Sequence, residues 1–158
     1  MQRTNAQKKG PLVVKLETDR LVYLHNERIH LRVLLTNVSS ERLYIPIPLD
    51  WGESASLSLW ASDAVSKKEV QGGFLADAPT PLPKKREDFV QLLPNHILGV
   101  SDQISLEDLN LNRQGKYELH VNYHSPVPSE FNLGLPIWSK EEGPIRSNIV
   151  TIEVAKSK

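Results

Sequence analysis

Cysteine is absent from this chain of 158 residues, and neither sign of charge is in excess. Without cysteine, a disulfide framework, a thiolate metal site and a cysteine nucleophile are all excluded. Nineteen basic residues balance nineteen acidic ones, so a general electrostatic attraction to nucleic acid is lacking, and we expect no nucleic-acid partner. No apolar run is long enough to cross a bilayer, so we expect no membrane span.

Motifs that carry chemistry are missing as well. The sequence contains neither a Gly-x-Ser-x-Gly nucleophile motif nor a phosphate-binding glycine loop. His120 and His124 lie about 13 Å apart along a strand that rises ~3.3 Å per residue, which is too far for both to hold one metal. Adjacent carboxylates such as Glu107 and Asp108 point apart in an extended chain. We therefore expect no enzyme activity, no cofactor, and no catalytic, cofactor-binding or metal-binding residues.

The residues that are present favour short strands around a core. Hydrophobic residues make up 39% of the chain, which is enough for a folded domain. Apolar and polar residues alternate in segments 29–35, 117–123 and 150–154, the pattern of half-buried antiparallel strands. Pro46 and Pro48 lack N–H groups on the same side of their strand, because residues two apart face the same neighbour. That strand is predicted to lie at a sheet edge.

One tyrosine indicates the fold. Tyr117 follows a turn at 109–115 and opens an alternating strand; in immunoglobulin-type sandwiches such a tyrosine bonds back to the backbone a few residues upstream. Turn signals recur roughly every ten residues along the chain. We predict an all-β fold, an immunoglobulin-like antiparallel two-sheet sandwich of seven to nine strands. Residues 11–155 are expected to form this single domain, and residues 1–10 a flexible lead-in.

Three short motifs resemble a known family. Residues 36–43 carry a T-N-x-S-x-x-x-L turn, Leu93 and Pro94 begin an apolar turn, and residues 115–117 form a G-x-Y corner. Over residues 28–124 these motifs resemble bacterial immunoglobulin-like domains and are similar to the family of Bacillus-type intracellular proteinase inhibitors, although Asn95 stands where that family has glycine. The resemblance implies the immunoglobulin-like fold and, as one option, inhibition of a proteinase.

Three aromatic residues are candidates for partner contact. Phe131 and Trp138 lie in a long connection at 125–147, and connections of that length are often functional. Trp60 lies on the opposite face of its strand from Leu57 and Leu59. Such side chains can stack on sugars or anchor a protein. We favour the alternative that the long connection folds over one end of the sandwich, because exposure of all its apolar residues would create an adhesive patch.

A basic segment follows three prolines. Lys84, Lys85 and Arg86 could form an inhibitory loop for a trypsin-like protease, whose pocket places an aspartate under a basic side chain. The alternative is a solvated, protease-sensitive tip. No disulfide or apolar anchor stiffens the segment, so we expect it to be cut rather than to inhibit.

Together these features favour a non-catalytic binding or structural module of bacterial origin, with a protein or carbohydrate partner. The alternative function is a proteinase inhibitor that acts through an exposed loop. We expect the protein to be extracytoplasmic, with any signal peptide already removed. A cytoplasmic location is left open. The oligomeric state is left open as well.

Overall fold

The computed structural model describes residues 10–52, 55–73 and 81–156. Within these ranges the chain forms eleven strands and three short 3₁₀ helices, as the all-β prediction requires. The strands are β1 (Leu12–Thr18), β2 (Val22–Leu24), β3 (Arg28–Asn37), β4 (Leu43–Pro46), β5 (Leu57–Asp63), β6 (Glu69–Gly72), β7 (Phe89–Leu92), β8 (Ile97–Ser105), β9 (Gly115–Tyr123), β10 (Ile145–Arg146) and β11 (Val150–Ala155), and the helices are η1 (Arg86–Asp88), η2 (Ser129–Phe131) and η3 (Lys140–Glu142). The strand count exceeds nine because short strands such as β2 and β10 show no alternation in sequence. The expected lead-in lies almost wholly outside the described residues.

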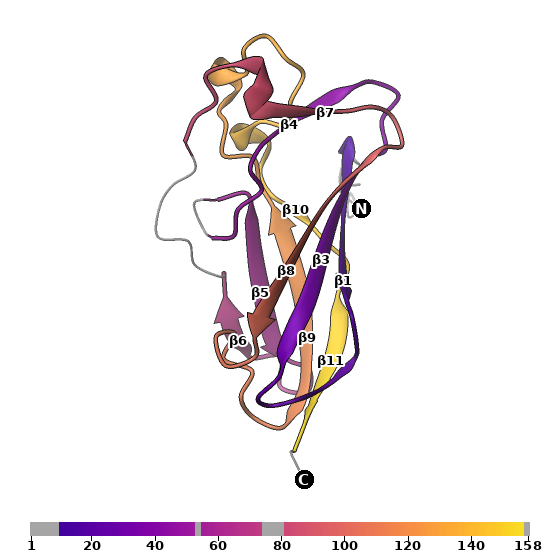
Figure 1. Ribbon diagram of the computed structural model, residues 1–158, viewed down its shortest axis with the longest axis vertical. Helices are drawn as coiled ribbons and strands as arrows, with labels where there is room; N and C mark the ends of the chain where they lie inside the picture. Colours follow the sequence, from indigo (N-terminus) through magenta and orange to yellow (C-terminus); the bar gives the residue numbers. More distant parts are fainter. Residues whose placement is uncertain (1–9, 53–54, 74–80, 157–158) are drawn as a thin grey trace, which may run out of the picture.

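Two main sheets pack face to face (Figure 1). One has the order β1-β3-β8, and the other has the order β2-β11-β9-β5-β6, with β10 also paired to β9. The pairings are antiparallel except that of β2 with β11, which is parallel. A small β4-β7 sheet lies at one end of the sandwich, beside the short helices (Figure 1). This arrangement is an immunoglobulin-like sandwich.

The core consists of the inward residues of both sheets, as the alternation predicts. Successive side chains of a strand point to opposite faces, so every second residue enters the core. In β3 these residues have no exposed surface, and the same holds for the inward residues of β5 and for most of those of β9. They are Ile29, Leu31, Val33 and Leu35 in β3, Leu57 and Leu59 in β5, and Leu119, Val121 and Tyr123 in β9.

One flank of β4 lacks a ladder, as predicted, but only Pro46 contributes, because β4 ends there and Pro48 lies beyond the strand. The N–H of Tyr44 donates to Pro136 O, on the side away from β7, and the nitrogen of Pro46 faces that same side. The N–H of Ile47 points the other way and donates to Asp88 O. Among the described residues, the flank opposite β7 has a single isolated bridge, between Tyr44 and Ile137.

The tyrosine corner is present. The Tyr117 side chain is buried, and its hydroxyl donates to Arg113 O at 2.8 Å. Arg113 lies in the turn that precedes β9, so the bond holds that turn against the strand. Another buried tyrosine of the same strand differs in one respect. The Tyr123 hydroxyl has no hydrogen-bond partner within the described part of the chain.

These two tyrosines provide a matched pair of variants. Tyr117→Phe removes a bond and leaves the Arg113 carbonyl unpaired, so we expect a loss of roughly 1 kcal/mol or more in the free energy of unfolding. Tyr123→Phe removes a buried hydroxyl that has no partner, so its effect is expected to be neutral or stabilising. Urea unfolding followed by circular dichroism measures both. Equal losses in the two variants would contradict the assignment of the corner.

Candidate functional site

A groove of about 400 Å³ opens on the outer face of the second sheet. Its floor comes from β5 and β9, and its wall comes from the connection that precedes β10. The groove is larger than depressions of about 200 Å³ beside Asp19 and about 260 Å³ beside Pro46. Its lining residues are Ser58, Trp60, Asn122, His124, Ser125, Lys140, Gly143 and Pro144.

Trp60 is held in the groove by its neighbours across the sheet. Its cross-strand partners are His120 in β9 and Gly72 in β6. The indole and the His120 imidazole are stacked, with ring centroids 6.3 Å apart and planes inclined by 7°. Gly72 leaves room for the indole, because a Cβ there would lie 3.2 Å from Trp60 Cζ3. The indole Nε1 donates to Ser58 Oγ at 3.1 Å, so stacking and hydrogen bonding together fix the ring.

His120 contributes an uncharged ring to this face of the sheet. Arg146 Nη2 lies 3.3 Å from His120 Nδ1. A guanidinium can only donate, so Nδ1 accepts and the imidazole proton belongs on Nε2. Burial, together with the charge of Arg146, lowers the pKa of His120 below its ordinary value of 6.5. The imidazole beside Trp60 is therefore neutral at pH 7.

Trp138 braces the wall of the groove. Its ring is partly buried against the core, and its Nε1 donates to Gly143 O at 2.8 Å. Lys140 N donates to Val127 O, which ties η3 to the start of the same connection. Phe131, by contrast, is 44% exposed and does not line the groove. Of the three aromatic candidates, only Trp60 lines the groove; Trp138 supports the lining residue Gly143 from behind, and Phe131 lies outside the site.

Sequence reasoning did not identify Asn122 or Lys140 as lining residues of this groove, or His120 as the neighbour of Trp60. His120 was considered only as a possible metal ligand. The signal that places it beside Trp60 is the register of β5 with β9, which pairs residues far apart in the sequence. No local pattern in the sequence reveals that strand register.

The basic segment adopts a closed turn. The backbone N–H groups of Lys84 and Lys85 both donate to Asp88 Oδ2, at 2.7 and 3.1 Å. Arg86 begins η1 and places its guanidinium 5.4 Å from the centre of the Tyr44 ring, where it also donates to the Tyr44 hydroxyl. All three basic residues are exposed. Lys85 has extended backbone angles, and the chain winds into the 3₁₀ turn from Arg86 onwards.

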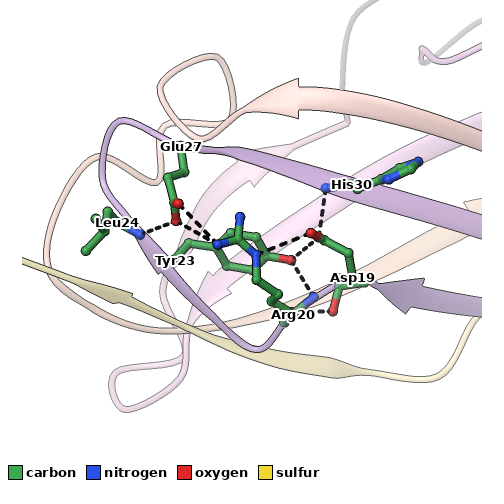
Figure 2. Close-up of polar contacts among 7 residues, drawn as sticks. Asp19, Arg20, Tyr23, Leu24, Glu27 and His30 are labelled. Atoms are coloured by element: carbon green, nitrogen blue, oxygen red, sulfur yellow. Dashed lines mark hydrogen bonds and ion pairs between the residues drawn. The ribbon is translucent and has the colours of Figure 1, made fainter.

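A second polar cluster joins β1, β2 and β3 (Figure 2). The Tyr23 hydroxyl donates to Asp19 Oδ1 at 2.6 Å, and that oxygen also accepts the backbone N–H of His30. Arg20 packs over the Tyr23 ring at 4.8 Å and pairs with Glu27. Both the carboxylate and the phenol are thus occupied by contacts within the fold. The cluster fastens three strands and offers no free acid or base.

The same cluster makes stability depend on pH at both extremes. Partial burial acts to raise the pKa of Asp19, but hydrogen bonds from Tyr23 and the His30 backbone outweigh it, and the pKa falls below 3.8. Burial, assisted by Asp19, raises the pKa of Tyr23 from 10.0 to about 12. The Asp19 contribution is therefore present above pH 3.8 and lost as the pH falls through the folded pKa. The Tyr23 contribution is present below pH 10 and lost as the pH rises towards 12.

Two variants test this pH dependence. Asp19→Asn should reduce the slope of the acid limb of a plot of unfolding free energy against pH, because one of the carboxylates whose pKa is lowered in the fold then no longer titrates. Tyr23→Phe should weaken the alkaline limb, and it should reduce the acid limb as well, because it removes the hydrogen bond that lowers the pKa of Asp19 most. Urea unfolding at intervals from pH 3 to pH 12 measures both limbs. Variant profiles parallel to that of the wild type at both ends would show that the cluster does not set this dependence.

Two kinds of feature are absent from the residues that the structure describes. No group of three or more His, Asp or Glu side chains in ranges 10–52, 55–73 and 81–156 is arranged to hold a metal ion. No helix within the same ranges is both long and apolar enough to cross a membrane.

Comparison with known proteins supports the fold and does not assign a family. No protein-family model matches the chain, and no curated protein matches it significantly. Among solved structures, the sporulation control protein Spo0M from Bacillus subtilis matches with a TM-score of 0.50 at 9% identity, covering 95% of this chain and 51% of that one. The chain thus spans about half the length of Spo0M. At this identity the likeness shows a shared fold alone.

Two further structures match at lower TM-scores. The CARDB domain of PF1109 from Pyrococcus furiosus has a TM-score of 0.43 at 10% identity, covering 93% of this chain and 96% of that one. A β-glucosidase from Listeria innocua has a TM-score of 0.45 at 13% identity, covering 93% of this chain and 16% of that one.

Proposed function

We propose that this immunoglobulin-like module is a non-catalytic binding module whose ligand surface is the groove beside Trp60, and that its ligand is an uncharged carbohydrate chain. The observation that carries the proposal is the fixed indole on the outer face of β5, beside a groove with polar side chains. An aromatic ring with an apolar face and polar neighbours suits a ligand that is itself apolar on one face and polar at its edges.

Sugars have that character. The faces of a pyranose ring carry C–H groups that can pack on the indole, and its hydroxyl groups both donate and accept hydrogen bonds. Asn122 supplies two donors and an acceptor, and the Lys140 ammonium supplies donors only. No carboxylate lines the groove among the described residues. Lys140 is the one permanent charge among the lining residues, which is too little to select a highly charged ligand.

A non-catalytic role agrees with the state of the titratable groups. The carboxylate and phenol of the Asp19 cluster are engaged within the fold, and His120 is held by Arg146 outside the lining of the groove. General acid–base catalysis needs a titratable group within reach of a bound substrate. The groove is lined by His124 and Lys140 but by no carboxylate among the described residues, and its stacking surface and hydrogen-bond partners suffice for binding.

The inhibitor alternative receives less support from the geometry. A protease cleft accepts an extended segment, whereas residues 84–88 form a turn closed by Asp88. Arg86, the best candidate for a trypsin-like pocket, rests on Tyr44. The segment would have to unwind before it could enter a cleft, and a segment that unwinds is a substrate rather than a rigid inhibitor.

Binding to soluble neutral oligosaccharides tests the proposal. We expect saturable binding by isothermal titration calorimetry to at least one member of a panel, with a change in tryptophan fluorescence. Trp60→Ala should weaken that binding by about tenfold or more, since the loss of a stacking aromatic is worth roughly 1–3 kcal/mol. Phe131→Ala is the matched control, because it removes an exposed aromatic outside the groove. Equal binding by Trp60→Ala and wild type, or binding to peptides alone, would contradict the proposal.

Incubation with trypsin tests the alternative. We expect cleavage within residues 84–86 without stoichiometric loss of protease activity. Mass spectrometry locates the cut, and a chromogenic substrate reports the remaining activity. An uncleaved chain that titrates trypsin one to one would instead support the inhibitor function. Lys84→Gln together with Lys85→Gln and Arg86→Gln should then abolish that titration.

A further inference from the structure

One edge of the first sheet is open. β8 pairs with β3, and no strand among the described residues pairs with its other side. Immunoglobulin sandwiches of the constant type fill this place with a fourth strand, which precedes the edge strand in sequence. Here the preceding strand is β7, and it pairs with β4 at the end of the sandwich instead. The place beside β8 is therefore left free by the described part of the chain.

The hydrogen bonds of β3 determine which backbone groups of β8 face this opening. His30 donates its N–H to Asp19 Oδ1, and its C=O accepts from Asp19 N, so both groups point towards β1. His30 lies opposite Gln103 in β8. In an antiparallel pair such a position is not hydrogen-bonded, so the N–H and C=O of Gln103 point outward. By the two-residue period, the same holds for Ser101, Gly99 and Ile97.

Side chains cap some open edge groups of this sheet but not these. The outward N–H of Gln103 donates to Asp102 Oδ1, and its C=O accepts from Arg28 Nη2. On the far edge of the same sheet, Asn148 both donates to Leu16 O and accepts from Leu16 N. Within the described residues, Ile97, Gly99 and Ser101 have no such cap, and all three are exposed. Segment 97–101 also lacks the lysine, proline or bulge that commonly guards an edge.

We propose that the β8 edges of two copies of this chain pair antiparallel about a two-fold axis at Gly99, which joins their first sheets into one continuous sheet. In this register each copy offers the outward N–H and C=O of Ile97, Gly99 and Ser101 to the other. This self-association uses no residue that lines the proposed carbohydrate groove. The partner is a second copy because the side chains of this register are self-complementary.

That complementarity has three parts. Gly99 faces Gly99 at the axis, so no side chains collide at the centre. On the core-facing side, half-buried Leu98 of one copy meets half-buried Val100 of the other, which extends the apolar core across the axis. At the ends, His96 meets Asp102, a pair that can form a charge-assisted hydrogen bond. No like charges face each other in this register. Like charges directly opposite each other would destabilise the sheet.

Sedimentation equilibrium tests the dimer. The contact is small, so we expect a weak dimer that forms between about 10 μM and 1 mM protein. Ser101→Pro removes an outward N–H without removing a bond to β3, and the extended Val100 before it tolerates proline. We expect this variant to raise the dissociation constant by about tenfold or more, because the two-fold axis repeats the loss. Ser101→Ala keeps the N–H and should dimerise like the wild type.

Amide hydrogen exchange in the wild-type chain provides a second measurement, which stands even if Ser101→Pro fails to fold. The amides of Leu98 and Val100 point towards β3 and should be protected at every concentration. The amides of Gly99 and Ser101 should gain protection as the protein concentration rises. A monomer at 1 mM, a dimer that Ser101→Pro leaves unchanged, or outward amides that stay unprotected in the dimer would each overturn the proposal.

Discussion

The buried amide of Asn37 holds the end of the sandwich together. The residue has no exposed surface, and every polar atom of its side chain is paired. Its Nδ2 donates to Glu41 O and Leu92 O, and its Oδ1 accepts from the backbone and the hydroxyl of Ser39. A buried amide with these partners stabilises one arrangement, because any other would leave polar groups unpaired. It fastens the end of β7 to the end of β3, at the end of the sandwich where β7 pairs with β4.

The local alternation of apolar and polar residues was enough to predict much of the fold from the sequence. The alternating segment predicted at 29–35 lies within β3, and the corner at Tyr117 forms as expected, because both depend on neighbours within a few residues. The pairing of strands that lie far apart in the sequence could not be predicted in the same way. Nothing in the sequence of β7 indicates that it pairs with β4 rather than β8. For the candidate site, Trp60 was identifiable as an outward aromatic, but His120 became its neighbour only through the register of two distant strands.

Asn95 shows why the departure from the resembled family does not change the fold. Its φ is 64°, in the left-handed region, and it follows Pro94 in a turn closed by the bond from His96 N to Leu93 O. A proline followed by a residue of positive φ is typical of a type II turn, where asparagine is tolerated in place of glycine. The turn therefore needs a backbone conformation rather than one residue type. The motifs shared with that family are accordingly requirements of the fold and carry no information about inhibition.

The groove and the open edge lie on different sheets. Trp60 and Asn122 face outward from the sheet that contains β5 and β9, whereas β8 belongs to the other sheet. Pairing along β8 would thus leave one open groove on each copy. Two weak sites held in one assembly turn the second binding event into an intramolecular one, provided that the ligand spans both. A polymer with repeated units meets that condition, and a single short ligand does not. The weak dimer and the carbohydrate chain would then strengthen each other, since a ligand that bridges two copies favours the paired state.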